Sequence, residues 1–301
     1  MEVRRVEDVV EGLATHDYLA DEPLATAVFL ALRMQRPLLL EGDAGVGKTE
    51  VALALARWTG GRLIRLQCYE GLDIGQAAYD WDHARQLLHL RATEITGEGA
   101  GTPAAALRDS LYGPDFLVRR PLLAAVDHDD DLAPVLLIDE VDRADDEFEA
   151  FLLEVLSDYA ITVPELGTFT AAQPPVVVLT SNRTRDLHDA LKRRCLYHWL
   201  EHPTRQREVA IIRLRVPHAT EVIAEEVATI AAALRDHGLY KPPGVAETID
   251  WAHALTVMGA RSVDGDLADL TLGAVLKYRE DQVRVRSHGV AAMVEAALGR
   301  R

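Results

Sequence analysis

The most constraining feature of the sequence is a glycine-rich segment in which an apolar run leads into a turn and then into a helix. Its residues are PLLLEGDAGVGKTEV, at positions 37–51. They satisfy the phosphate-loop (Walker A) pattern G-x-x-x-x-G-K-[ST], in which backbone N–H groups surround the α- and β-phosphates of a nucleotide. In this pattern Lys48 contacts the β- and γ-phosphates, and the Thr49 hydroxyl binds Mg²⁺. We expect the nucleotide to contact Gly42, Asp43, Ala44, Gly45, Val46, Gly47, Lys48, Thr49 and Glu50.

The residues on both sides of this loop fit the same interpretation. Residues 38–40, LLL, suit a strand that is buried on both faces, and residues 50–57, EVALALAR, are strong helix formers. The N-terminus of such a helix favours an anion because its backbone N–H groups and dipole point toward it. Tyr18 and Leu19, in the segment before the strand, are candidates for lining a base pocket, and ordinary core packing is the alternative.

A second motif, a hydrophobic strand that ends in two carboxylates, occupies residues 134–142, PVLLIDEVD. This is the Walker B pattern, in which Asp139 holds Mg²⁺ directly or through water and Glu140 orients the attacking water as general base. Taken alone, a strand that ends in an acidic turn explains the same residues. The phosphate loop upstream favours the catalytic interpretation.

A polar residue follows the next predicted buried strand. The strand covers residues 176–180 and ends in Ser181 and Asn182. A side chain at this strand end can hydrogen-bond both the attacking water and the γ-phosphate, so Asn182 is a candidate sensor of the nucleotide. The alternative is an asparagine that caps a turn.

Three cations, Lys192, Arg193 and Arg194, precede a short apolar strand. The simpler interpretation is a solvated helix end whose positive charges match the helix dipole. The alternative is an arginine finger, which one subunit supplies to the nucleotide of its neighbour.

Composition limits the partners and the compartment that we expect. The 301 residues carry a net charge of −16, which opposes non-specific nucleic-acid binding because that binding depends on Lys and Arg. Two cysteines, Cys68 and Cys195, form no C-x-x-C pair, so they indicate buried apolar side chains and neither a disulfide framework nor a zinc site. The sequence contains no recognisable signal peptide or membrane span, and we expect a cytoplasmic protein.

Hydrophobic periodicity predicts an α/β region over the first two thirds of the chain. Two helices are expected within residues 3–35, a strand at 63–66, a helix at 81–93, a loop at 96–103 and a β-hairpin within 161–170. The sequence therefore predicts a sheet of buried strands with helices between them.

Strand patterns disappear after about His202. The helices expected beyond this point cover residues 204–215, 220–237, 248–258 and 267–283. We therefore expect a nucleotide-binding α/β domain, residues 1–202, followed by an all-α lid domain, residues 203–301.

The motifs in order, GDAGVGKT, VLLIDEVD, VLTSN and LKRRC, resemble those of the AAA+ ATPases, specifically of their MoxR branch. The predicted hairpin resembles the pre-sensor hairpin of that clade, and DEVDRA at 139–144 looks like its D-E-hydrophobic-N-R-A signature with Asp142 in place of Asn. RLQCYEGLD at 65–73 resembles the segment that leads to its second-helix insertion. AAYDWDHARQLL at 77–88 and AETIDWAHAL at 246–255 look closest to MoxR-type proteins encoded beside carbon monoxide dehydrogenase and related molybdenum hydroxylases.

The resemblance implies a P-loop NTPase core with a parallel sheet and a small helical lid, assembled into a hexameric ring that hydrolyses ATP with Mg²⁺. It also implies chaperone-like remodelling or maturation of a client, such as metal or cofactor insertion. A molybdenum hydroxylase is the candidate client, and a von Willebrand factor A-domain protein is the candidate partner.

The resemblance also suggests roles for individual residues. Arg194, next to Cys195, resembles the family's arginine finger and is preferred to Arg193. The implied catalytic residues are Glu140, Asn182 and Arg194, and the implied metal ligands are Thr49 and Asp139. Relatives carry a lid motif like G-A-S-P-R-A, whose arginine touches the γ-phosphate, but this chain has GVAETI at 244–249. Hydrolysis would then be slow or use another cation, such as Arg261.

Two other classes of function remain open. A nucleotide-gated scaffold would bind ATP and hydrolyse it weakly; the missing lid arginine favours this class, and the intact Asp139 and Glu140 oppose it. A clamp-loader-like ATPase that acts with nucleic acid would share the R-C finger. The net acidity and the lack of a basic helix-turn-helix pattern oppose it.

Overall fold

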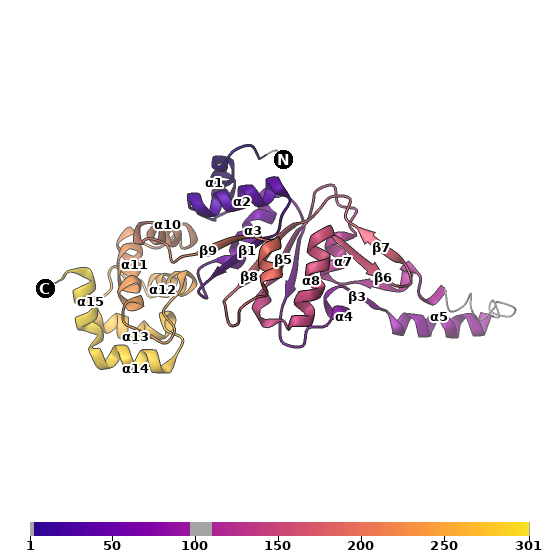
Figure 1. The fold of residues 1–301 in the computed structure, drawn as a ribbon. Helices are drawn as coiled ribbons and strands as arrows, with labels where there is room; N and C mark the ends of the chain where they lie inside the picture. The colour runs from indigo at the N-terminus through magenta and orange to yellow at the C-terminus, as the bar shows by residue number, and fades with distance from the viewer. Residues whose placement is uncertain (1–2, 97–109, 301) are drawn as a thin grey trace. The chain divides into compact units, whose positions relative to one another are not determined.

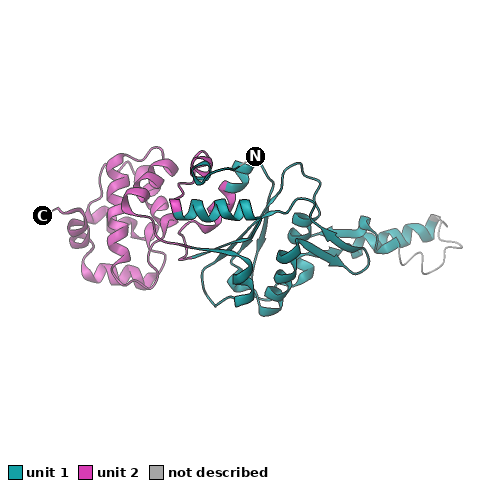
Figure 2. Ribbon diagram, turned by 45° about the horizontal axis from the view of Figure 1, so that its top comes forward, with its two compact units in different colours: residues 1–9, 23–41, 55–198 teal, residues 10–22, 42–54, 199–301 magenta. Residues whose placement is uncertain are grey.

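A computed structural model of the chain describes residues 3–96 and 110–300. Contacts between residues divide the chain into two units, drawn in teal and magenta in Figure 2. The first unit comprises residues 1–9, 23–41 and 55–198, and the second comprises residues 10–22, 42–54 and 199–301. The division into domains at residues 202 and 203 stays a prediction. Of the expected loop at 96–103, residues 97–103 lie outside the described part of the chain.

Five strands form the central sheet, in the order β2-β5-β8-β1-β9 (Figure 1). In that order they span Leu63–Gln67, Val135–Asp139, Val176–Ser181, Leu38–Gly42 and Leu196–Leu200. The pairings of β2 with β5, β5 with β8 and β8 with β1 are parallel. Every residue of β1 and β5 is buried, as expected for apolar strands that are covered on both faces. The predicted α/β fold with a parallel sheet is confirmed.

Helices connect these strands. Two of them, α2 (Glu22–Met34) and α3 (Lys48–Thr59), flank β1 in the sequence. Between β5 and β8, α8 (Asp146–Asp158) begins where the Asp145 side chain accepts the Phe148 N–H at 2.9 Å, an N-cap that stabilises the first turn. This part also contains the helices α1 (Val6–Ala14), α4 (Ile74–Ala77), α5 (His83–Thr96), α7 (Pro121–Val126) and α9 (Asp189–Arg194), and the 3-10 turns η1 (Pro114–Phe116) and η2 (Val141–Arg143).

The described residues also form two small antiparallel sheets in addition to the central one. The predicted hairpin is present as β6 (Ala160–Val163) and β7 (Gly167–Thr170). A second pair, β3 (Tyr79–Trp81) and β4 (Leu117–Arg119), was not predicted. The expectation that Trp81 begins a helix is wrong, because Trp81 pairs with Leu117 and α5 starts only at His83. Strands of three residues are too short to show a period of two in the sequence.

Six helices form the C-terminal part of the second unit. They are α10 (Arg205–Arg215), α11 (Glu221–Arg235), α12 (Val245–Val257), α13 (Gly265–Val275), α14 (Arg279–His288) and α15 (Val290–Leu298). The single helix expected at 267–283 is wrong. The chain leaves the helical conformation at Leu276, whose side chain is buried, so packing sets a break that local periodicity does not reveal.

The helical part has its own core, and two polar contacts hold its helices in register. Trp251 is 1% exposed and its indole N–H donates to the Thr271 hydroxyl at 2.8 Å, which joins α12 to α13. Glu208, on α10, is fully buried and accepts two hydrogen bonds from the Arg235 guanidinium at 2.8 and 2.6 Å. A buried carboxylate needs such a partner because transfer of an unpaired charge out of water is costly.

Both cysteines are buried, as the sequence predicts. Burial raises the pKa of Cys68 and of Cys195 to about 12. Neither thiol is therefore a reactive thiolate near neutral pH. Across residues 3–96 and 110–300, no helix has the length and apolar character needed to cross a membrane.

Candidate functional site

The phosphate loop lies between β1 and α3, as predicted. It requires glycine at its first position, where Gly42 has a φ of +155° and an added Cβ would lie 2.5 Å from the Leu200 carbonyl oxygen. The Lys48 ammonium donates to the carbonyl oxygens of Gly42 and Asp43, at 2.7 Å each. Lys48 is 6% exposed, so its charge is held by the loop's own backbone. Phosphate oxygens would compete with these two carbonyl groups for the ammonium.

Two side chains of the second unit, Tyr18 and His202, lie near this loop. An added Cβ on Gly47 would lie 3.8 Å from the Tyr18 ring, and burial raises the pKa of Tyr18. The His202 Nε2 lies 3.4 Å from the Asp43 carboxylate, while burial and the Arg235 charge lower the pKa of His202. The contact of Tyr18 with the loop agrees with a place near the nucleotide, but the role in a base pocket stays a prediction.

The helical lid contacts the same loop through the N-terminus of α12. The backbone N–H groups of Val245 and Ala246 donate to the Gly45 carbonyl oxygen at 2.9 and 3.2 Å. An added Cβ on Gly45 would lie 2.7 Å from a Glu247 carboxylate oxygen. The segment 244–249 contains no arginine or lysine, so what it presents to Gly45 is backbone N–H groups and one carboxylate. Thr248 is fully buried and donates to Glu208 at 2.9 Å.

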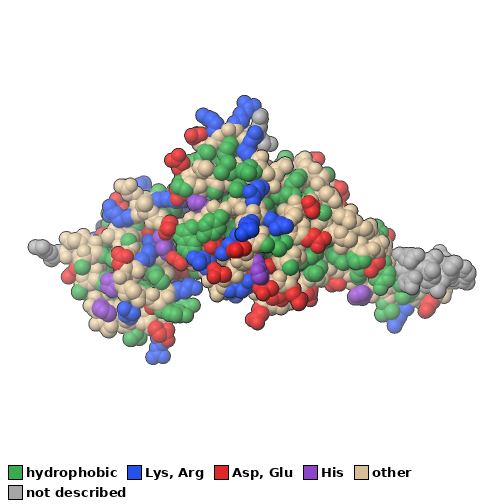
Figure 3. Space-filling view, in the orientation of Figure 1, with side chains coloured by type: hydrophobic (Ala, Val, Ile, Leu, Met, Phe, Trp, Pro, Cys, Tyr) green, Lys and Arg blue, Asp and Glu red, His purple; other side chains and the backbone are tan. Residues whose placement is uncertain are grey.

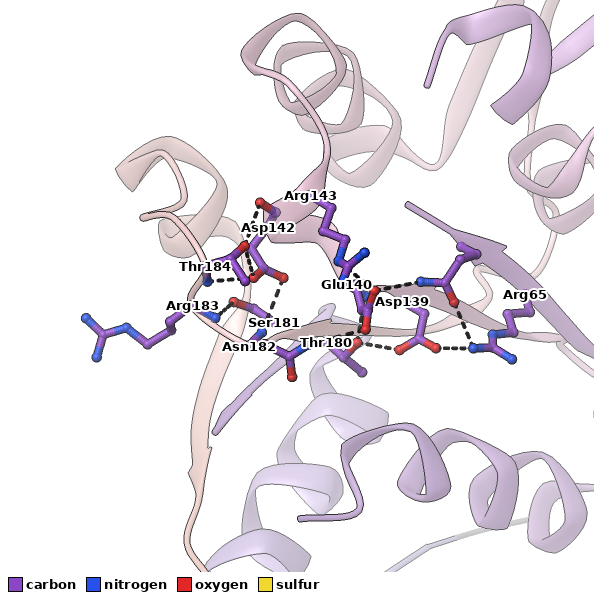
Figure 4. Close-up of polar contacts among 11 residues, drawn as sticks. Arg65, Asp139, Glu140, Asp142, Arg143, Thr180, Ser181, Asn182, Arg183 and Thr184 are labelled. Atoms are coloured by element: carbon purple, nitrogen blue, oxygen red, sulfur yellow. Dashed lines mark hydrogen bonds and ion pairs between the residues drawn. The ribbon is translucent and has the colours of Figure 1, made fainter. Parts of the chain in front are cut away.

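The predicted metal ligand Asp139 is the last residue of β5, in the first unit. It is 3% exposed and accepts the Thr180 hydroxyl of β8 at 2.6 Å (Figure 4). Its second carboxylate oxygen lies 2.5 Å from the guanidinium of Arg65, on β2. The neighbouring strands β2 and β8 thus supply a partner to each carboxylate oxygen of Asp139.

The predicted general base Glu140 directly follows β5 and has a left-handed backbone, with φ 54° and ψ 50°. The Asn182 side-chain amide donates to one of its carboxylate oxygens at 3.3 Å, so the structure brings these two predicted catalytic residues together. Its other carboxylate oxygen accepts the Gln67 amide at 3.2 Å and lies 2.9 Å from the Arg143 guanidinium. The side chain is 30% exposed, so water can reach it.

Asp142, at the position where the MoxR resemblance leads one to expect asparagine, fixes the loop after β8. Its carboxylate accepts the backbone N–H of Asn182 at 3.2 Å, and the N–H and hydroxyl of Thr184 at 2.8 and 2.7 Å. It is 2% exposed. These bonds orient the backbone that carries Asn182 toward Glu140.

Arg194 is the last residue of α9, and its described contacts involve none of Asp139, Glu140 and Asn182. Its guanidinium donates to the Ser157 hydroxyl of α8 at 2.6 Å and to the Ala190 carbonyl oxygen at 3.4 Å. The side chain of Arg36 donates to the carbonyl oxygens of Arg193 and Arg194 at 2.7 and 3.2 Å, and so holds the end of the helix. The role of Arg194 as a finger stays a prediction.

Sequence reasoning missed four residues whose side chains contact Asp139 or Glu140: Arg65, Gln67, Arg143 and Thr180. Arg65 and Gln67 share one side of β2, because side chains in a strand alternate with a period of two. The alternation is visible in RLQ at 65–67, but only the pairing of β2 with β5 places these two side chains beside the carboxylates. Arg143 lies three residues after Glu140, on the 3-10 turn η2.

The site fits magnesium of the kind that nucleotides bring with them. Across the described residues, no group of three or more His, Cys, Asp and Glu side chains could hold a metal by itself. Mg²⁺ in nucleotide sites takes one or two carboxylates, and phosphates and water complete its shell. The buried carboxylate of Asp139 supplies the hard oxygen ligand that such a site needs.

Comparison with known proteins identifies the family. A family model described as "AAA domain (dynein-related subfamily)" matches residues 37–195, more than half of the chain. Midasin of Giardia intestinalis is 46% identical over 50 residues, or 17% of this chain and 1% of that protein. The tRNA dimethylallyltransferase of Chlamydia abortus is 38% identical over 64 residues, or 20% of this chain and 19% of that protein. The chain therefore spans only a small part of either relative.

A solved structure gives a weaker likeness. It is a crystal structure from Cytophaga hutchinsonii ATCC 33406 whose description assigns an ATPase only provisionally. The match covers 98% of this chain and 94% of that chain, with 13% identity and a TM-score of 0.47. The family assignment rests on the sequence match, which extends from the strand before the phosphate loop to Cys195. By that match, the chain belongs to the AAA domain family, in its dynein-related subfamily.

Proposed function

We propose that this protein is an ATPase that hydrolyses Mg-ATP. One observation carries the proposal: Glu140, at the end of β5, meets the amide of Asn182, which follows the neighbouring strand β8. This pairs a carboxylate that can accept a proton from water with an amide that can orient it. Membership of the AAA domain family supports nucleotide binding.

Each motif has a role in the proposed reaction. The loop from Gly42 to Glu50 binds the phosphates, with Lys48 as the point charge and the Thr49 hydroxyl as a metal ligand. Asp139 is the second metal ligand, and Glu140 is the general base. Magnesium, when bound, neutralises charge on the phosphate oxygens.

We further propose that the ATPase is of the MoxR type, forms a hexameric ring in the cytoplasm, and remodels or matures a client protein, as a chaperone does. The order of motifs and the hairpin β6–β7 support this assignment. Arg194 would complete the site of the neighbouring subunit. We also propose a molybdenum hydroxylase as the client and a von Willebrand factor A-domain protein as the partner. Both rest on the resemblance alone.

A nucleotide-gated scaffold is the second candidate. The contact of Gly45 with the start of α12 favours it, because segment 244–249 brings a carboxylate and no cation to the phosphate loop. A nucleic-acid machine is disfavoured. The net charge is −16, and on the face drawn in Figure 3 Lys and Arg side chains are interspersed with Asp and Glu.

Two substitutions test the proposal by separating binding from hydrolysis. Lys48→Ala should abolish tight ATP binding, because it removes the charge that faces the β- and γ-phosphates. Glu140→Gln should bind ATP but release phosphate about 10²–10⁴-fold more slowly, the usual worth of a general base. Equilibrium binding of ATP and a phosphate-release assay measure both effects, and Lys277→Ala, a change at a half-exposed lid lysine, is the control.

The same pair of variants distinguishes the candidates. If folded Lys48→Ala binds ATP with unchanged affinity, the proposed phosphate-binding role of the loop around Lys48 is wrong. Wild-type protein that binds ATP without measurable hydrolysis would establish the scaffold instead.

A further inference from the structure

Two arginines of the chain itself lie against the Walker B carboxylates (Figure 4). Arg65 lies 2.5 Å from Asp139, and Arg143 lies 2.9 Å from Glu140. The settings of these two pairs differ. The Asp139 side chain is 5% exposed, whereas that of Glu140 is 30% exposed, so Asp139 depends far more on its ion partner.

Arg65 reaches Asp139 from the edge strand of the sheet. Its Nη2 also donates to the Gln67 side-chain oxygen at 2.8 Å, on the same side of β2. The amide of Gln67 in turn donates to Glu140. A single guanidinium nitrogen thus uses both of its hydrogens, one for Asp139 and one for Gln67. These two bonds hold the guanidinium, and the Arg65 side chain is 53% exposed, so solvent borders it on its other side.

The group that stabilises the negative charge of the buried Asp139 carboxylate should differ between the metal-free and the metal-bound site. Without metal, its charge is stabilised by the Thr180 hydroxyl on one oxygen and by Arg65 on the other. If Asp139 held a divalent cation, that cation would stabilise the same carboxylate charge, and the guanidinium of Arg65 would be repelled by it because like charges repel at this distance. Arg65 and Mg²⁺ therefore compete for Asp139.

We propose that Arg65 is a positioning residue that acts as the exchangeable counter-ion of Asp139: it neutralises the carboxylate in the metal-free site and leaves it when Mg-nucleotide binds. The inference rests on the proposed function, because it takes Asp139 as the metal ligand. It goes further in giving β2 a part in setting how much magnesium the site requires.

The test measures the magnesium requirement of nucleotide binding rather than activity. A fluorescent ATP analogue is titrated at fixed concentration against MgCl₂ with wild type, Arg65→Met and Arg62→Met, and the Mg²⁺ concentration at half-maximal binding is recorded. Arg62 is the matched control, because it is also 53% exposed and is paired with an aspartate, Asp130, at 3.1 Å. A second measurement records thermal unfolding in EDTA and with saturating Mg-nucleotide.

Arg65→Met should lower the half-maximal Mg²⁺ concentration about tenfold, the range expected for loss of a hydrogen-bonded charge partner. It should also lower the unfolding temperature in EDTA, and saturating Mg-nucleotide should restore most of that loss. Arg62→Met should leave the half-maximal Mg²⁺ concentration within twofold of wild type. Arg65→Gln, which keeps a donor for Asp139 but no charge, is measured in the same way should Arg65→Met not fold, with the same expected direction.

An unchanged or raised magnesium requirement in the Arg65 variants, with normal Mg-dependent binding by wild type, overturns the inference and leaves the proposed function standing. A wild type whose nucleotide binding does not depend on magnesium overturns both. An equal loss of unfolding temperature with and without Mg-nucleotide assigns Arg65 to the fold alone, and so also overturns the exchange.

Discussion

At the scale of single residues, the backbone conformation of Glu140 shows how the site is built. Glu140 and Arg183 have φ values of 54° and 55°, in the left-handed region that non-glycine residues rarely adopt. Each follows the carboxyl end of one of the neighbouring strands β5 and β8. Strain of this kind persists where surrounding contacts impose it and is frequent at functional sites. At Glu140, the backbone N–H donates to the Thr180 hydroxyl at 2.9 Å, and Gln67, Arg143 and Asn182 hold the carboxylate.

This strain predicts an order of stability for two variants that both lose the carboxylate. Glu140→Gly should be more stable than Glu140→Ala by about 1 kcal/mol, because glycine adopts the left-handed conformation without a Cβ clash. Denaturant unfolding measures the difference. At Glu154, on the exposed side of α8, the order should reverse because glycine weakens a helix. Equal stability of the two Glu140 variants would show that the backbone there carries no strain.

Motifs located the phosphate loop, Asp139, Glu140 and Asn182 because each follows a recognisable buried strand. The sequence could not show that Arg65 and Gln67 join them. Their contacts depend on which strand lies beside β5, and that neighbour is separated from it by about 70 residues of chain. The left-handed conformation of Glu140 was equally hidden, since no glycine marks it.

At the scale of elements, helix α12 is the part of the lid whose position bears most directly on the phosphate loop. The sequence predicted this helix to begin at residue 248, but it begins at Val245. The difference matters, because the N–H groups of Val245 and Ala246, in the added first turn, donate to the Gly45 carbonyl oxygen. A capping contact from Glu247 to the Gly244 N–H, at 3.0 Å, fixes the start of the helix. Periodicity did not reveal this turn because polar and small residues interrupt the apolar pattern there.

The contact predicts unequal effects of one substitution at two glycines. Gly45→Ala and Gly71→Ala place alanine at nearly equal positive φ, +81° and +80°, but an added Cβ has neighbours only at Gly45. Both should lose about 1 kcal/mol to backbone strain, and Gly45→Ala should lose about 1–3 kcal/mol more to overpacking against α12. Chemical denaturation measures both losses. Equal losses would mean that α12 gives way without cost.

At the scale of the whole molecule, the proposed mechanism requires more than one chain. Arg194 donates to the Ser157 hydroxyl of its own chain, whereas the bonds described above for Asp139, Glu140 and Asn182 come from other residues. An arginine that completes a neighbour's site is worth about 10³–10⁵ in turnover, whereas a surface arginine at a helix end contributes a few tenths of a kcal/mol to stability. The two roles differ by orders of magnitude in activity.

A mixing experiment separates them. Arg194→Ala should bind ATP nearly normally and hydrolyse it poorly, while Arg193→Ala is the adjacent control. Mixing Arg194→Ala with Lys48→Ala subunits should restore part of the activity, because some interfaces then pair an intact Lys48 with an intact Arg194. Phosphate release by the mixture, with mass spectrometry to verify mixed rings, measures this. Mixed rings that remain inactive, or dilute monomers that hydrolyse at the full rate, would show that the site is not shared.

The buried carboxylate of Glu208 links three helices of the lid. Glu208 lies on α10, its partner Arg235 lies on α11, and its second partner Thr248 lies on α12. Separating α10 from α11 would leave a charge unpaired in the interior, at a cost of about 3–5 kcal/mol, and moving α12 away would break the Thr248 hydrogen bond to the same carboxylate. The three helices are therefore expected to move as one rigid group. The first turn of α12 donates the N–H groups of Val245 and Ala246 to the Gly45 carbonyl oxygen, so a shift of the phosphate loop is expected to move the three helices together.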